Sequence, residues 1–220
     1  YAYEGMRLRM RLGLTSFKHV GIFPEQAANW DFIYDNCLAL GGDGRTEAPR
    51  VLNLFAYTGG ASLAACAAGA DTTHVDSVKQ VVTWARENME LSGLDGIRWI
   101  VEDALKFVQR EVRRGNRYHG IILDPPAFTK SRRTANNAEK GYKEINLRAM
   151  RLLPRGGYLA TASCSHFMPA ERFERMLRSA AADAGVELRQ IEARQQCADH
   201  PILWGVPETN YLKFYLFQVI

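Results

Sequence analysis

The chain has 220 residues with 47% hydrophobic and 24% charged residues and a formal net charge of +4. This composition excludes a disordered chain, and the length suits one large domain or one domain with a small appendage. No apolar run reaches the roughly 18 residues that a membrane span needs, and no leader opens the chain. We therefore expect a cytoplasmic protein without a membrane anchor, and the start at Tyr1 indicates a piece of a longer one.

The four cysteines also bear on the compartment. They are scattered and form no CxxC pair, so the sequence predicts neither a metal site nor a disulfide framework. Thiols without such a framework fit a reducing cytoplasm. The four are Cys37, Cys66, Cys164 and Cys197.

The first 45 residues are predicted to form an N-terminal extension. Polar and apolar residues alternate from Met6 to Leu12, which predicts a strand with one wet face, and Lys18–Phe23 is its expected partner strand. A helix should begin near Pro24, because proline is favoured in a first helical turn. We therefore expect a strand pair and a helix over residues 1–45, lying against a main domain over residues 46–220.

The main domain opens with the stretch from Val51 to Gly60. An apolar strand, Val51–Phe55, is followed by the turn Thr58-Gly59-Gly60 and a helix of small residues, Ala61–Ala68. Strand, glycine turn and helix are the opening of a nucleotide-binding α/β unit. Small helical side chains allow close packing on a sheet, and glycine lets the backbone approach a ligand.

Strands and helices then alternate to the end of the chain. This alternation predicts an α/β fold with a doubly wound, mostly parallel sheet. The further predicted strands are Thr73–Val75, Ile97–Val101, Gly120–Leu123, Tyr158–Ala162, Val186–Ile191 and Tyr211–Val219. The further predicted helices begin at a Ser77 capping box and then cover Ala104–Arg114, Glu139–Leu153 and Pro169–Asp183.

Polar residues follow several of these strands and should meet at one edge of the sheet. Ligands of such folds bind outside the carboxyl ends of the strands. Asp76 is expected to accept hydrogen bonds from a ribose, because Ser77 is available to cap the next helix. Asp103 suits an adenine amino group or the N-cap of the following helix, and the two roles are compatible. The gathered set is Tyr57–Gly60, Asp76, Asp103, Asp124 and Cys164.

The glycine turn favours S-adenosylmethionine over NAD. A dinucleotide fingerprint has the spacing G-x-G-x-x-G around a pyrophosphate, whereas this turn has only adjacent glycines, Gly59 and Gly60. S-adenosylmethionine carries no phosphate, so it needs a glycine turn but not the complete G-x-G-x-x-G loop that surrounds a pyrophosphate.

Two stretches carry chemistry. Asp124 is followed by two prolines, which stiffen the backbone and remove amide donors, so its carboxylate can be held at a reaction centre. Phe128 in the same stretch offers a face on which a base can stack. Cys164 ends a strand between two serines, where it is either a buried small side chain or a nucleophile.

These motifs together resemble the class I methyltransferases, and more narrowly the 23S ribosomal RNA cytosine-5 methyltransferases that carry an N-terminal PUA domain, which is absent here. The resemblance covers residue 17 to the end. It rests on Asn53–Gly60, Val75-Asp76-Ser77, Asp124–Phe128, Gly141–Asn146, Ser163-Cys164-Ser165, Ala198–Pro201 and Tyr211-Leu212-Lys213.

The resemblance implies a seven-stranded Rossmann-like sheet with an antiparallel C-terminal strand. It also implies S-adenosylmethionine as cofactor and Cys164 and Asp124 as catalytic residues. The cofactor-binding residues it suggests are Gln26, Asn53, Phe55, Tyr57, Thr58, Gly59, Asp76, Ser77, Asp103, Ala104 and Asp124. The family shows Asp-Gln-Arg followed by Asn-Arg where this chain has Glu25-Gln26-Ala27-Ala28-Asn29, so Gln26 is kept and the arginines are not.

The leading hypothesis is an S-adenosylmethionine-dependent methylation of cytosine carbon 5 in ribosomal RNA, through a Cys164 thiolate adduct. His166 and His200 are candidates for the base that removes the carbon-5 proton. Three alternatives stay open: methylation of a ring nitrogen or amine with Cys164 as a bystander, an NAD-dependent dehydrogenase, and a non-catalytic RNA-binding module. Clusters of basic residues, Arg7 to Arg11, Arg110 to Arg117 and Lys130 to Lys143, suit an RNA partner.

Overall fold

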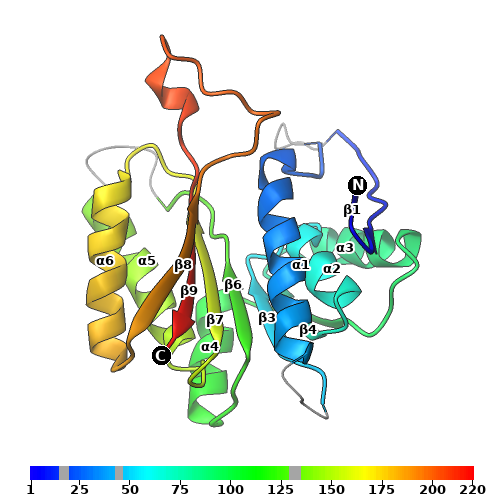
Figure 1. The fold of residues 1–220 in the computed structure, drawn as a ribbon, viewed down its shortest axis with the longest axis horizontal. Helices are drawn as coiled ribbons and strands as arrows, with labels where there is room; N and C mark the ends of the chain where they lie inside the picture. The colour runs from blue at the N-terminus through cyan, green and yellow to red at the C-terminus, as the bar shows by residue number, and fades with distance from the viewer. Residues whose placement is uncertain (15–19, 43–46, 129–134) are drawn as a thin grey trace.

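A computed structural model describes residues 1–14, 20–42, 47–128 and 135–220 (Figure 1). The chain begins with two short antiparallel strands, β1 (Ala2–Tyr3) and β2 (Met6–Arg7). A 3-10 turn, η1 (Pro24–Gln26), leads into the helix α1 (Ala27–Gly42). The helix expected near Pro24 is thus confirmed.

The extension has a strand pair, but its strands are not the two that were predicted. β2 ends at Arg7, its partner is β1, and residues 20–23, the described part of the expected second strand, are not in a strand. The backbone beyond β2 finds other partners: the amides of Arg9 and Arg11 donate to the side chains of Ser92 and Asn88. The alternating pattern therefore reflects a segment held by polar side chains rather than by a neighbouring strand.

The main sheet has seven strands in the order β5-β4-β3-β6-β7-β9-β8. All neighbouring pairs are parallel except the two that involve β9, which is antiparallel to both β7 and β8. The predicted fold class is confirmed, including the antiparallel C-terminal strand. The strands are β3 (Arg50–Leu54), β4 (Asp71–Asp76), β5 (Arg98–Val101), β6 (Gly120–Leu123), β7 (Tyr158–Ser163), β8 (Leu188–Arg194) and β9 (Lys213–Val219).

Helices cover both faces of this sheet (Figure 1). The helices are α2 (Gly60–Ala67), α3 (Lys79–Leu91), α4 (Ala104–Arg113), α5 (Ala135–Met150) and α6 (Ala170–Ala184). Successive residues of one strand point to opposite faces. Accordingly, Leu52 packs with residues of α4, α5 and α6 in one core, whereas its neighbour Val51 packs with residues of α1 and α2 in the other.

Two predicted boundaries, the start of α5 and the start of the main domain, lie at or beside undescribed residues. α5 begins four residues before the predicted Glu139 and ends at Met150, and part of the predicted basic loop before it lies outside the described residues. The predicted division between residues 45 and 46 also falls in an undescribed segment and stays a prediction. Among the described residues, no helix is both long and apolar enough to cross a membrane.

The order of strands sets the place of a site. The chain moves outward from β3 to β4 and β5, then returns to β6 on the other side of β3. Ligands of open α/β sheets bind at such a switch point, outside the carboxyl ends of the strands. The loops after β3, β4, β6 and β7 are therefore expected to form the ligand site.

Candidate functional site

The turn after β3 has an unusual backbone. Phe55 and Tyr57 have φ angles of 57° and 48°, and Gly59 has 96°. Positive φ is uncommon for residues with a side chain, and such strain concentrates at functional sites. At Gly59 a Cβ atom would lie 3.2 Å from the Cβ of Ala85, so both the conformation and the packing favour glycine there. The turn is thus held in one shape by the structure around it.

Asp76 supports this turn from the end of β4. One carboxylate oxygen accepts a hydrogen bond from the Tyr57 amide at 3.0 Å, and the other accepts from the Val78 amide at 2.9 Å. The N-cap of α3 is Val78, with no side-chain capping bond, so the expectation that Ser77 caps this helix is wrong. The Ser77 side chain is exposed. The Asp76 carboxylate, through its bond from the Val78 amide, therefore orders the start of α3.

Asp103 and Ala104 stand at the start of α4. The Asp103 carboxylate accepts a hydrogen bond from the Lys106 amide at 2.9 Å, which confirms its role as N-cap. Ala104 is buried in the core. Their adenine-binding role stays a prediction.

The buried polar residues near the turn have protein partners. The Asn53 amide donates to the Ser62 hydroxyl at 2.9 Å, and the Thr58 hydroxyl donates to the Gly21 carbonyl at 2.6 Å. Both side chains are buried. They therefore brace the turn against α2 and the N-terminal segment.

Asp124 lies directly after β6, facing the N-terminal segment. The Gln26 side-chain amide donates to its carboxylate at 2.8 Å, and Asn29 in turn donates to the Gln26 carbonyl at 2.6 Å. Burial and the nearby Glu25 carboxylate raise the pKa of Asp124 to about 7, against the lowering effect of the Gln26 bond. The fold thus keeps this carboxyl close to its protonation midpoint at neutral pH.

Cys164 lies directly after β7, the strand next to β6. Burial raises the pKa of its thiol, and the Asp124 charge raises it further. The Ala127 backbone amide and the Lys213 ammonium act in the opposite direction. The loops after β6 and β7 therefore meet, as the sequence predicted, and the net effect of these surroundings is to raise the pKa of the Cys164 thiol.

Three residues near Asp124 and Cys164 were not predicted as site residues from the sequence: Glu25, Tyr211 and Lys213. The Tyr211 hydroxyl donates to the Glu25 carboxylate at 2.9 Å. The Lys213 ammonium donates to the carbonyls of Ser165 and Tyr211, each at 2.6 Å. The available sequence signal was the place of Glu25 in the stretch Glu25–Asn29 and of the other two in the motif Tyr211-Leu212-Lys213.

The candidate bases lie around these residues. The ring of His166 lies 5.7 Å from that of Tyr211, and the His200 ring nitrogen lies 3.7 Å from a Glu25 carboxylate oxygen. Phe128 is 38% exposed and meets the edge of the Tyr142 ring at 4.7 Å between centroids. No contact selects one of the two histidines for proton transfer.

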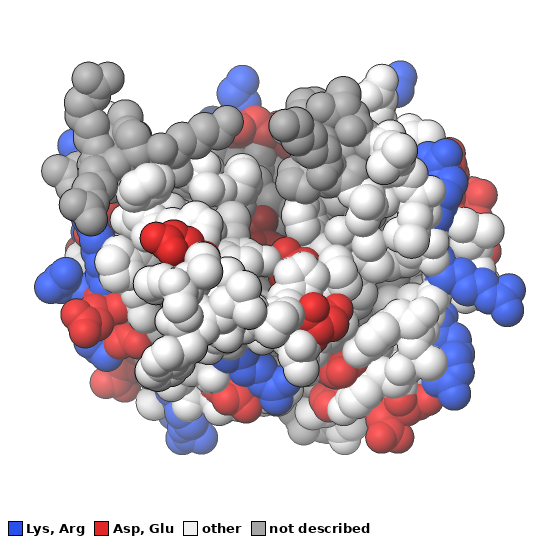
Figure 2. Space-filling model, turned by 90° about the horizontal axis from the view of Figure 1, so that it is seen from above, with Lys and Arg blue, Asp and Glu red and all other residues white. Residues whose placement is uncertain are grey.

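Most of the described residues of the predicted basic cluster from Arg110 to Arg117 lie away from this site. Arg113, Arg114 and Arg117 lie at the far end of α4 and before β6, that is, toward the amino ends of the strands. Arg110 instead donates to Glu102, directly after β5. Figure 2 shows the face above the carboxyl ends as mostly neutral, with carboxylates in and beside a central hollow and Lys and Arg toward the sides. Lys130, Arg132 and Arg133 lie outside the described residues. Arg113, Arg114 and Arg117 are therefore remote from a ligand bound beside Asp124.

A small cavity of about 80 Å³ joins the turn to Asp124. It gathers seven of the predicted residues: Gln26, Asn53, Phe55, Tyr57, Thr58, Gly59 and Asp124. Asp76, Ser77, Asp103, Ala104 and Cys164 do not line it. Among the described residues, no group of three or more His, Cys, Asp or Glu side chains could hold a metal ion.

A family model described as S-adenosylmethionine-dependent methyltransferase matches residues 3–215. The chain belongs to this family. The methyltransferase family confirms the predicted cofactor, S-adenosylmethionine, and gives no support to the dehydrogenase alternative.

Curated relatives carry a more specific name. The chain is 38% identical over 174 residues to the Ribosomal RNA large subunit methyltransferase I of Klebsiella pneumoniae, a match that covers 78% of this chain and 44% of the relative. The protein of that name from Shigella dysenteriae is 38% identical over 177 residues, covering 79% and 44%. The chain thus spans about half the length of the curated relatives it matches.

Solved methyltransferases share the fold. A SAM-dependent methyltransferase from Agrobacterium tumefaciens is 29% identical, with a TM-score of 0.71 over 99% of this chain and 71% of that one. One from Streptococcus mutans is 22% identical, with a TM-score of 0.79 over 100% of this chain and 57% of that one.

Proposed function

We propose that this chain is the catalytic part of an S-adenosylmethionine-dependent methyltransferase that acts on ribosomal RNA, at carbon 5 of a cytosine. The name of the Klebsiella relative supports a ribosomal RNA substrate. The meeting of Asp124 and Cys164 at the ends of adjacent strands supports the cytosine carbon and is the observation that carries the proposal. The cytoplasmic location stays a prediction.

The residues after β3 and β4 fit the cofactor. Each Asp76 carboxylate oxygen already accepts one backbone amide and keeps acceptor capacity for a ribose hydroxyl. The left-handed backbone at Gly59 opens the turn to the cavity that also reaches Asp124. Bound there, S-adenosylmethionine supplies an electrophilic methyl group. Asp103 at the next strand end would then face its adenine.

Cys164 has the chemistry that cytosine requires. Carbon 5 of a cytosine is a poor nucleophile, and addition of the Cys164 thiolate at carbon 6 places electron density on carbon 5. Carbon 5 of the adduct would then bond to the methyl carbon, and the bond from that carbon to the cofactor sulfur would break, which leaves S-adenosylhomocysteine. The bond between Cys164 and carbon 6 breaks again when a base removes the carbon-5 proton and the electron pair restores the ring double bond. The Asp124 carboxyl, with its pKa near 7, can donate to ring nitrogen 3 when protonated.

One other function has an observation in its favour. The pKa of Cys164 is raised, so a reaction that needs no thiolate is also compatible with this site. In that case Asp124 and Phe128 would hold a base whose ring nitrogen or amine receives the methyl group, and Cys164 would be a bystander.

A trapping experiment distinguishes methylation at carbon 5 through a Cys164 adduct from methylation at a nitrogen. RNA that contains 5-fluorocytosine has no removable proton on carbon 5, so an enzyme that uses a cysteine adduct stays attached to it. We expect a covalent complex that is lost in Cys164→Ala and kept in the matched variant Cys66→Ala, whose thiol lies beside the Asp95 carbonyl. Full methyl transfer by Cys164→Ala would overturn the cytosine-5 proposal and favour the nitrogen.

A further inference from the structure

A second, larger cavity lies at the base of the segment between β8 and β9. This segment, residues 195–212, is called the β8–β9 arm here and rises above the sheet in orange in Figure 1. The cavity, called the β9 cavity, has a volume of about 680 Å³, within the range of roughly 300 to 1,000 Å³ that is common for ligand sites. Its walls come from the start of α6, the end of β8, the start of β9 and the arm.

The β9 cavity lies at the same edge of the sheet as Cys164. β9 is antiparallel, so its first residue, Lys213, pairs with Ser163 at the end of β7. On the other side of β9, Arg194 at the end of β8 pairs with Phe214. Adjacent strands lie roughly 5 Å apart, so the β9 cavity begins about one strand beyond the thiol. It also lies on the side of Cys164 that is away from the glycine turn, because β7 separates β9 from β6.

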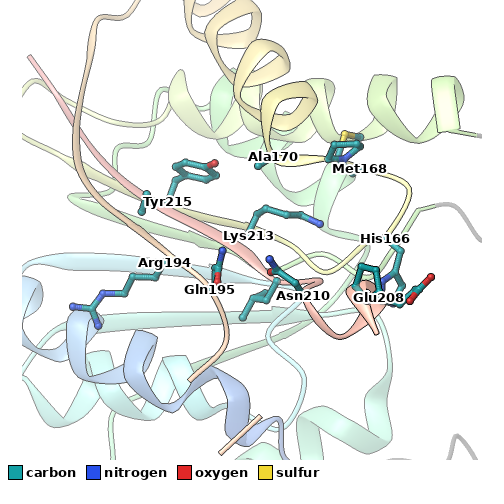
Figure 3. Close-up of a pocket in the computed structure, with 13 residues that line it drawn as sticks. His166, Met168, Ala170, Arg194, Gln195, Glu208, Asn210, Lys213 and Tyr215 are labelled. Atoms are coloured by element: carbon teal, nitrogen blue, oxygen red, sulfur yellow. The ribbon is translucent and has the colours of Figure 1, made fainter. Parts of the chain in front are cut away.

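Charge in the β9 cavity suits an anionic ligand. Lys213 contributes a cation, and Glu208 is the acidic residue of the lining. The Arg194 guanidinium is directed to α1 instead, where it donates to the Ala28 carbonyl and lies over the Phe32 ring. In Figure 3 the Lys213 side chain extends toward His166. The Lys213 charge also acts on the Cys164 thiol, so a phosphate bound at Lys213 would be close to the reacting base.

Two amides give the β9 cavity its capacity to recognise a base. Gln195 and Asn210 both line it and lie between Arg194 and Glu208 in Figure 3. Both residues are exposed, and neither side chain hydrogen-bonds to any other part of the described chain. A side-chain amide offers two donors and an acceptor, the pattern that a nucleobase edge matches.

We propose that the β9 cavity receives the nucleotide next to the target base of the RNA substrate. Gln195 and Asn210 contact its base, and Lys213 contacts the phosphate that links it to the target. This inference rests on the proposed function, since an RNA base must be presented at Cys164. Sequence-specific proteins read single-stranded RNA through unstacked bases of this kind.

Crosslinking tests the position directly. The probe is a nine-nucleotide single-stranded RNA with a central 5-fluorocytidine and a 4-thiouridine on one side of it, prepared in both orders. After irradiation, mass spectrometry should find the 4-thiouridine of one probe attached to residues 193–195 or 207–215. Crosslinks confined to other peptides, or none, would overturn the proposal. Because the Cys164 adduct is scored separately, a β9-cavity crosslink without an adduct supports this site while the cysteine mechanism fails.

Affinity gives a second measurement. The double variant Gln195→Ala, Asn210→Ala is expected to weaken binding of the same RNA about tenfold, the loss that one good base contact brings. Affinity for S-adenosylhomocysteine should stay as in the wild type. The matched control Gln190→Ala, an exposed residue of β8 outside the β9 cavity, should bind the RNA normally. Unchanged RNA affinity in the double variant would contradict base recognition by these amides.

Discussion

The Asp124 carboxyl links the chemistry of the site to the stability of the fold. Its pKa rises from 3.8 to about 7, mainly through burial. Because the folded carboxyl holds its proton more tightly than the unfolded one, the free energy of unfolding falls as pH rises from about 4 to about 7. Above pH 7 both states are ionised and this loss is constant.

Asp124→Asn removes that buried charge and can keep the Gln26 hydrogen bond. We expect it to increase the free energy of unfolding at pH 8 by about 1 to 3 kcal/mol, with a gain that shrinks toward zero at pH 4. Urea unfolding at several pH values measures this. Asp95→Asn, at an exposed carboxyl, is the control and should show no such pH dependence. A loss of stability at pH 8 in Asp124→Asn would show that the carboxylate is stabilised rather than strained.

Lys213 is expected to control the reactivity of Cys164. Its positive charge lowers the pKa of the thiol, while its own pKa is lowered to about 8 by burial. Replacement by Met should therefore slow alkylation of Cys164 by iodoacetamide at pH 7.5 by about three- to tenfold, and Lys213→Arg should slow it less. Mass spectrometry of the modified peptide gives the rate. Equal rates in the wild type and Lys213→Met would mean that Lys213 only donates hydrogen bonds to the Ser165 and Tyr211 carbonyls and does not affect the reactivity of the thiol.

The site residues that the sequence revealed differ in kind from those it did not. Asp124 and Cys164 each end an apolar strand, so their convergence follows from topology alone. The Glu25–Tyr211 bond joins residues 186 positions apart, and no local pattern reports such a contact. The error at Ser77 has a similar origin, because the choice between two adjacent capping side chains depends on how the strand end is held by Tyr57.

At the scale of elements, the contact between α1 and α2 is expected to tolerate little change. A Cβ atom at Gly60 would lie 2.5 Å from the Trp30 ring, so Gly60→Ala must displace a buried aromatic side chain. Overpacking of this kind costs about 1 to 3 kcal/mol of unfolding free energy. Thermal or urea unfolding tests it, with Gly42→Ala as the control, since nothing lies within 4 Å of a Cβ atom there. Equal stabilities would indicate that Trp30 moves freely.

Elements were predictable where burial alone decides them. β6 matches its predicted bounds because all four of its residues are buried and the polar residues His119 and Asp124 flank it. The predicted strand from Met6 to Leu12 is reduced to β2, because the amides of Arg9 and Arg11 donate to the side chains of Ser92 and Asn88, contacts without a sequence period. Alternation of polar and apolar residues reports which side chains are buried, and it does not report what the backbone pairs with.

For the whole molecule, the site depends on both ends of the chain. Glu25 and Gln26 precede the sheet, Asp124 and Cys164 follow its central strands, and Lys213 opens the last strand. β9 lies between β7 and β8, so residues 213–219 complete both the sheet and the surroundings of the Cys164 thiol. Asp124 and Cys164 therefore reach their final surroundings only when β9 has joined the sheet, whereas the glycine turn belongs to an earlier unit of the chain.

Cofactor binding should stabilise this assembled domain as a unit. A ligand at 100 times its dissociation constant adds about 2.7 kcal/mol, and 1 kcal/mol shifts the melting temperature of a domain this size by about 2 to 4 °C. We therefore expect S-adenosylhomocysteine to raise the melting temperature by about 5 to 10 °C and NAD to leave it unchanged. Asp76→Ala should lose most of the shift, because the carboxylate orders the turn through Tyr57 and is the proposed partner of the ribose, whereas Asp95→Asn should keep it. A shift of normal size in Asp76→Ala would remove Asp76 from the cofactor site, since the same turn would then bind without its support.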